Sequence, residues 1–110
     1  MGQRIADLIG FPLRNAESYQ IVYYTGGTQY NDHHDAFNDE TEEGRKHLKR
    51  GGQRIYTAIA YLNDVEEGGQ TVFDAGITIT PQKGRAILWP NVLSDKPDTI
   101  DPRTHHEALP

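Results

Sequence analysis

Short β-prone segments separated by closely spaced turn residues constrain the fold of this 110-residue chain more than any other feature. In residues 53–62, apolar side chains occupy both alternating faces, which predicts a central strand that is covered on both sides. Shorter strands are expected at residues 71–73, 77–80 and 85–89, with glycine and proline between them. Strands this short, spaced this closely, indicate a mainly β fold, an antiparallel sandwich or barrel.

The N-terminal third predicts one short helix followed by two strands. Residues 3–9 place their apolar side chains on one helical face, and Gly10 supplies the left-handed stop. Residues 19–25 are rich in tyrosine and β-branched side chains, which favours a strand that turns at Gly26 and Gly27. A second short strand is expected at residues 30–35.

Two polar segments are expected to lack regular structure. Residues 38–50 change from acidic to basic midway, and we interpret them as a solvated loop or a frayed helix. Residues 91–102 hold two prolines and three aspartates, and we expect a loop that leads to His105 and His106. The length predicts a single domain over residues 1–110.

Composition excludes several classes of function. Sixteen acidic and eleven basic side chains give a net charge of −5, which argues against nucleic acid or an anionic membrane as a partner. The absence of cysteine excludes disulfides, thiol catalysis and cysteine-based zinc sites. The sequence predicts a soluble chain without a signal peptide or a membrane span, and it indicates neither a compartment nor an oligomeric state.

The histidines are the most informative polar residues. His33 and Asp35 lie two positions apart on a predicted strand, so both side chains leave the same face, whereas His34 points away. Together with a later histidine they would form the two-histidine, one-carboxylate set that suits Fe(II). Taken alone, a His-x-Asp pattern also arises by chance in a solvated turn.

Longer motifs surround this pair. The most specific is the block R-x-x-T-x-x-x-Y-L-N-D-V-x-E-G-G-x-T-x-F, residues 54–73, and further matching segments occur at residues 19–24, 30–35, 81–89 and 106–110. With these motifs in this order, nearly the whole chain resembles the catalytic domain of prolyl 4-hydroxylase-like 2-oxoglutarate/Fe(II) dioxygenases. The resemblance implies a double-stranded β-helix (a jelly roll), in which two sheets enclose the iron at one open end.

The resemblance also implies roles for individual residues. It makes His33, Asp35 and His106 the iron ligands, and it favours His106 over His105 because the family's ligand precedes a proline by four residues, here Pro110. It makes Tyr24 the tyrosine that reaches 2-oxoglutarate, although Tyr24 could instead be an ordinary core residue.

Other positions of these motifs are expected to have structural roles. Gly68 and Gly69 permit a tight reversal, Thr71 and Phe73 are structural, with Phe73 filling the core, and Trp89 packs. The family places a Lys or Arg about ten positions beyond the distal histidine to pair with the far carboxylate of 2-oxoglutarate, and this sequence ends before that position. We therefore expect a domain that is incomplete at both ends and that binds the cosubstrate weakly by itself.

The function that the resemblance implies is a 2-oxoglutarate- and Fe(II)-dependent dioxygenase that hydroxylates a peptidyl proline and converts 2-oxoglutarate to succinate. It also implies ascorbate as a reductant and a peptide or protein as the substrate. One alternative is a family member that acts on another side chain or on a small molecule. Another alternative is a β-barrel module that binds metal without turnover, or a β domain whose histidines bind nothing.

Overall fold

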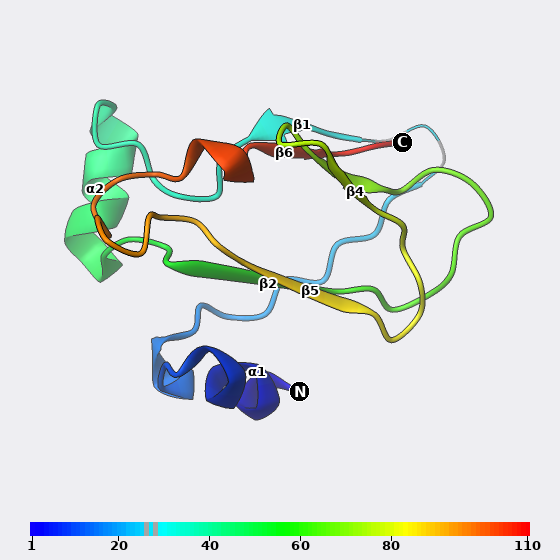
Figure 1. Cartoon of the computed structure of the whole chain (residues 1–110), viewed down its shortest axis with the longest axis horizontal. Coiled ribbons are helices and arrows are strands. Elements are labelled where there is room, and N and C mark those ends of the chain that lie inside the picture. The colour runs from blue at the N-terminus through cyan, green and yellow to red at the C-terminus, as the bar shows by residue number, and fades with distance from the viewer. Residues whose placement is uncertain (26, 28) are drawn as a thin grey trace.

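The fold is seen in a computed structural model that describes residues 1–25, 27 and 29–110 (Figure 1). Its described strands form two antiparallel sheets, a four-stranded sheet of order β1-β6-β3-β4 and a two-stranded sheet of β2 and β5. The elements in chain order are α1 (Gly2–Ile9), η1 (Leu13–Asn15), β1 (Tyr30–His33), α2 (Glu42–Gly51), β2 (Tyr56–Ala60), β3 (Thr71–Phe73), β4 (Ile77–Ile79), β5 (Ala86–Pro90), η2 (Pro102–Thr104) and β6 (His106–Ala108).

The two sheets face each other across a small aromatic core. Phe73 on β3 meets Trp89 on β5 edge to face, with the ring centroids 5.1 Å apart, and both residues are buried. A hydrogen bond of 2.7 Å between the hydroxyls of Tyr61 and Thr71 joins the two layers a few residues away. The expected packing of Phe73, Thr71 and Trp89 is therefore confirmed, and so is a mainly β fold with antiparallel sheets.

Helix α1 confirms the predicted N-terminal helix and lies outside the sheet layers (Figure 1). Gly10 ends it with a left-handed φ of 77°, and its amide donates to the Ala6 carbonyl. Ala6 is the buried position of the helix. Beyond it, Phe11 meets Tyr56 of β2 with the rings 5.8 Å apart, so α1 is attached to the β2-β5 layer.

The prediction of a loop or frayed helix for residues 38–50 was wrong, because residues 42–51 form the regular helix α2. The Thr41 hydroxyl caps it by accepting a hydrogen bond of 3.0 Å from the Gly44 amide. Its first turn is acidic and its last turn is basic, the arrangement that complements a helix dipole. The change of charge sign along this segment is thus a helix signal.

The strand predicted at residues 19–25 was also wrong, because no described residue of this segment belongs to a sheet. The segment runs from η1 towards β1 with most side chains in solvent; Ile21 is 83% exposed and Tyr23 is 86% exposed. Strand propensity depends on a neighbouring strand and on a face to bury, and this segment has neither among the described residues. A turn was predicted at Gly26 and Gly27. Gly27 has a φ of 84°, and Gly26 lies outside the described residues.

Strand β2 is shorter and more exposed than the central strand predicted at residues 53–62. Among the described strands it pairs only with β5, and Tyr56 and Ala58 are exposed, so its two faces are not both covered. Backbone hydrogen bonds from Asn91 to Ile55 and from Tyr61 to Arg85 continue the pairing beyond both ends of the strand. The alternation of side chains along residues 53–62 predicts that a strand forms there. It does not predict how many strands lie beside it.

The remaining predicted strands are confirmed with small changes of length. Residues 71–73 form β3, residues 77–79 of the predicted 77–80 form β4, and β5 starts and ends one residue later than predicted. The strand predicted at residues 30–35 ends at His33. Residues 91–102 are mainly a loop that includes a bridge between Val92 and Ile100. None of the described helices is long and apolar enough to span a lipid bilayer.

Candidate metal centre

Strand pairing brings His33 and His106 together. The two residues are direct partners in the antiparallel ladder of β1 and β6, and on the other side of β6, Phe73 of β3 is the partner of His106. Residues that face each other across a ladder project from the same face of the sheet. Both imidazoles therefore lie on the face that meets the β2-β5 layer, with their centroids 4.3 Å apart.

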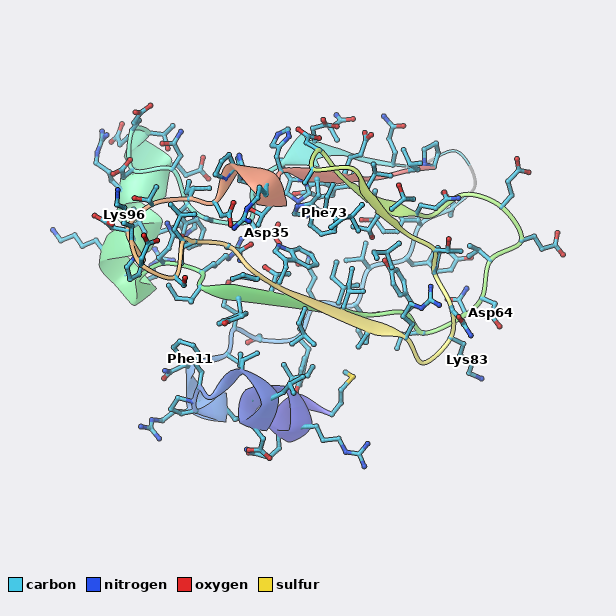
Figure 2. The ribbon with its side chains drawn as sticks, viewed as in Figure 1. Phe11, Asp35, Asp64, Phe73, Lys83 and Lys96 are labelled. Carbon is cyan, nitrogen blue, oxygen red and sulfur yellow. The ribbon has the colours of Figure 1, made fainter. Side chains whose placement is uncertain are left out.

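Asp35 completes the group although it lies beyond the end of β1, in a bend. Its Oδ1 is 3.1 Å from His33 Nε2 and 3.5 Å from His106 Nε2. One ligand atom from each of the three residues lies within 4.8 Å of the others. Figure 2 shows Asp35 near Phe73, between the layer of η2 and β6 and the layer of β5.

Each imidazole is oriented by a backbone carbonyl. His33 Nδ1 is 2.8 Å from the Asn31 carbonyl, and His106 Nδ1 is 2.6 Å from the Thr104 carbonyl. A carbonyl can only accept a hydrogen bond, so Nδ1 carries the proton in both rings. In the neutral imidazole the lone pair is then on Nε2, and both Nε2 atoms face the Asp35 carboxylate.

This arrangement fits a divalent metal ion. Two nitrogen lone pairs directed at a carboxylate oxygen repel each other unless a cation lies between them. Adjacent octahedral ligands at about 2.1 Å from a metal lie about 3 Å from one another, close to the two separations observed. A carbonyl on the second ring nitrogen is also the usual outer partner of a metal-bound histidine.

Aromatic side chains hold the imidazoles in place. Tyr30 packs on His33 with the centroids 4.2 Å apart, and Trp89 packs on His106 at 4.9 Å. Phe73 lies 5.3 Å from His106. His106 is 4% exposed, so its ring has little room to turn.

Two residues after α2 hold the segment that carries Asp35. The Gln53 side chain accepts from the Phe37 amide at 2.8 Å and donates to the Phe37 carbonyl at 3.0 Å. The Arg54 guanidinium lies 4.5 Å above the Phe37 ring and donates to the Asp35 carbonyl at 3.3 Å. Asp35 is therefore fixed from a second part of the chain.

Arg54 is itself held by a bidentate ion pair with Glu17. Its Nε donates to one carboxylate oxygen at 2.7 Å and its Nη2 to the other at 2.9 Å. These hydrogen bonds lower the pKa of Glu17 below its ordinary value and raise that of Arg54. Arg85, the other arginine of residues 53–90, binds the Thr80 carbonyl and the Gln82 side chain.

We expect Arg54→Met to weaken Mn(II) binding by up to about tenfold, because Arg54 holds the backbone carbonyl of Asp35 and not its carboxylate, and losing a partner of the ligating group itself costs about 10- to 100-fold. The free energy of unfolding should change by about 1 kcal/mol or less, since the ion pair is partly exposed. Arg85→Met, which removes a guanidinium with two partners elsewhere, is the matched control. Isothermal titration of both variants with Mn(II) measures this. If Arg54→Met and Arg85→Met bound Mn(II) with equal affinity, Arg54 would not position Asp35.

His105 and His34 lie apart from this group. His105 Nδ1 is 2.5 Å from Asp74 and 3.9 Å from Asp32, and these three residues form a second, more exposed set of possible ligands. His34 packs on His105 with the centroids 4.8 Å apart, and burial followed by the nearby His105 lowers the pKa of His34. The structure thus brings His106, and not His105, to His33 and Asp35.

Tyr24 lies on the extended segment before β1 and is 46% exposed. Partial burial, and then the neighbouring Tyr30, raise the pKa of its phenol. Tyr30 in turn packs on His33. Its role toward 2-oxoglutarate stays a prediction.

Gly68 and Gly69 each have a positive φ, and the bend of this segment lies just before them, at residues 66–67. A Cβ on Gly68 would lie 2.0 Å from the Pro110 carbonyl oxygen, and the Gly69 amide donates to that oxygen at 3.2 Å. The turn therefore needs glycine both for its conformation and for the close approach of the segment after β6.

Sequence analysis missed the residues that support the ligands. Gln53 and Arg54 follow a polar helix, and no local pattern shows that their side chains reach back to residues 35–37. The carbonyls of Asn31 and Thr104 belong to the backbone, so the residue type at these positions does not indicate that they bind a histidine. A signal was available for Arg54, because it opens the R-x-x-T block.

Comparison with known proteins identifies the family of the chain. A family model described as the 2OG-Fe(II) oxygenase superfamily matches residues 19–110. The chain belongs to this superfamily, and within it the chain resembles prolyl 4-hydroxylases.

Two named relatives illustrate the similarity. The chain is 36% identical over 128 residues to "Probable prolyl 4-hydroxylase 8" of Arabidopsis thaliana, with 97% of this chain and 41% of that protein covered. It is 36% identical over 111 residues to "Prolyl 4-hydroxylase subunit alpha-1" of Homo sapiens, with 100% of this chain and 20% of that protein covered. The chain thus spans well under half the length of these curated relatives.

Proposed function

We propose that this chain provides the iron-binding part of a 2-oxoglutarate- and Fe(II)-dependent dioxygenase that hydroxylates a proline residue in a peptide. The observation that carries the proposal is the meeting of His33 Nε2, His106 Nε2 and Asp35 Oδ1, with both Nδ1 atoms bound to carbonyls. Family membership and the names of the relatives support the choice of cosubstrate and substrate.

His33, Asp35 and His106 would hold the iron as its three protein ligands. When bound, Fe(II) supplies open coordination positions at which O2 and 2-oxoglutarate react, so that a C–H bond becomes C–OH while 2-oxoglutarate becomes succinate and CO2. The chain contributes a fixed set of donors, because Arg54 and the backbone carbonyls orient them. Tyr24 would donate its phenol hydrogen to 2-oxoglutarate, and ascorbate would serve as the reductant, as the family implies.

The proposed fold is the double-stranded β-helix of the family. Two antiparallel sheets that face each other across Phe73 and Trp89 support it, as do ligands at one end of the β1-β6 ladder. In this fold, one layer carries the two histidines and the opposite layer supplies Trp89 as their apolar cover.

Oxygen consumption that depends on both Fe(II) and 2-oxoglutarate tests the proposal. With a proline-containing peptide present, we expect one succinate per hydroxyproline formed, measured by mass spectrometry. Succinate formation without peptide hydroxylation would favour another substrate. Metal binding without any consumption of 2-oxoglutarate would instead favour a module that binds metal without turnover.

A further inference from the structure

A groove of about 1070 Å³ lies beside the metal centre, between the segment after β1, helix α2 and the loop before η2. A smaller hollow of about 250 Å³ shares four wall residues with it, at positions 34 and 36–38, and also includes Asp35. The groove therefore shares part of its wall with the hollow that a proposed iron ligand lines. Figure 2 shows Lys96, in the loop before η2, close to α2.

Apolar side chains and carboxylates line this groove. Phe37, Leu48, Pro97 and Ile100 provide apolar walls. Three acidic residues stand among them: Asp39, Glu40 and Asp98. None of the described residues that line the groove is a lysine or an arginine.

These three carboxylates lack cationic partners. Within the described residues, none of them forms an ion pair, and all three residues are exposed. The nearby arginines bind groups other than these three carboxylates. Arg45 donates to the backbone carbonyl of Asp39, Arg54 pairs with Glu17, and Arg103 pairs with Asp101.

We propose that this groove holds the part of the substrate peptide that flanks the hydroxylated residue, and that it selects peptides with lysine or arginine there. The proposal rests on the function proposed above and adds a sequence preference to it. The volume of about 1070 Å³ lies just above the range for small-molecule pockets, about 300 to 1,000 Å³, which leaves room for a peptide segment. Unpaired carboxylates favour a cationic chain by charge complementarity and repel phosphates or acidic peptides.

The test compares peptides of equal length that share one central proline and differ only in flanking lysine, alanine or glutamate. Fluorescence anisotropy with the Mn(II)-loaded chain measures their affinities. We expect the lysine peptide to bind about tenfold more tightly than the glutamate peptide at low salt. Each exposed ion pair contributes only a small part of the binding free energy, so several together are needed for this difference. The difference should shrink at 0.5 M salt, because screening shortens the reach of exposed charges.

A triple variant localises the effect. Asp39→Asn, Glu40→Gln and Asp98→Asn together should abolish the preference for lysine. The matched control is Asp64→Asn, Glu66→Gln and Glu67→Gln, which makes the same change of net charge in the loop at the opposite end from Lys96 (Figure 2). The control should keep the preference.

The outcomes separate this proposal from the one on which it rests. Equal binding of all three peptides by the unchanged chain, or a preference lost equally in both triple variants, would overturn the groove as the selective surface. The salt dependence needs no variant, so a lysine preference that persists unchanged at 0.5 M salt would overturn the role of the carboxylates even if the triple variant fails to fold. Metal binding without succinate formation, but with the lysine preference intact, would overturn the proposed chemistry and leave the groove assignment standing.

Discussion

Replacing His33 by alanine is expected to lower the affinity of the chain for Mn(II) by at least about 100-fold. Loss of an outer partner alone costs about 10- to 100-fold, and this change removes a ligand itself. His106→Ala should have the same effect, because the two imidazoles face one carboxylate oxygen from adjacent strands. Isothermal titration under anaerobic conditions with Mn(II) or Fe(II) measures both.

His105→Ala is the matched control, because it removes the same side chain one residue away. His105 lies instead with Asp32 and Asp74, which form the other set of possible ligands. We expect His105→Ala to bind Mn(II) like the unchanged chain. The reverse result, with affinity lost in His105→Ala and kept in His106→Ala, would move the metal to the more exposed set.

Trp89→Ala is expected to lower the free energy of unfolding by about 3 to 5 kcal/mol, the usual cost of truncating a large buried aromatic residue. Trp89 is 7% exposed and contacts both Phe73 and His106, so its removal opens a cavity between the two layers. Urea unfolding followed by circular dichroism measures the change.

Leu62→Ala provides the control for this prediction. Leu62 is 63% exposed, and its truncation should change the free energy of unfolding by less than about 0.5 kcal/mol. If Trp89→Ala does not fold at all, Trp89→Phe keeps much of the apolar volume and should lie between the two. A Trp89→Phe variant as stable as the unchanged chain, together with a small loss for Trp89→Ala, would mean that the sheets do not depend on this contact.

Local signals predicted some elements well. Helix α1 was predicted from its apolar face and Gly10, and β3, β4 and β5 from β-branched residues between turns. The ligand pair came from two positions on one predicted strand, although Asp35 lies in the bend after that strand. Of these elements, α1 and the β3-β4 pair are local in sequence, whereas β5 pairs with the earlier strand β2 and was predicted from its own apolar run.

Elements whose state depends on distant partners were predicted less well. Residues 19–25 have high strand propensity, but no described strand pairs with them. The number of neighbours of β2 could not be inferred, because alternation reports which positions are apolar and not which strand lies beside them. Helix α2 differs for another reason, since a run of mixed charge is typical both of a solvated loop and of a helix whose acidic first turn and basic last turn complement its dipole.

The β1-β6 ladder has a consequence for how the metal centre assembles. Positions 33 and 106 are 73 residues apart in sequence (106 − 33), yet they are direct partners. Closing a loop of that length costs chain entropy before any ligand group is in place, and such non-local pairing is typical of slow-folding topologies. A metal ion held by both histidines would act as a cross-link across that loop. The fraction of metal sites that are occupied and the fraction of chains that are folded would then rise together with the metal concentration.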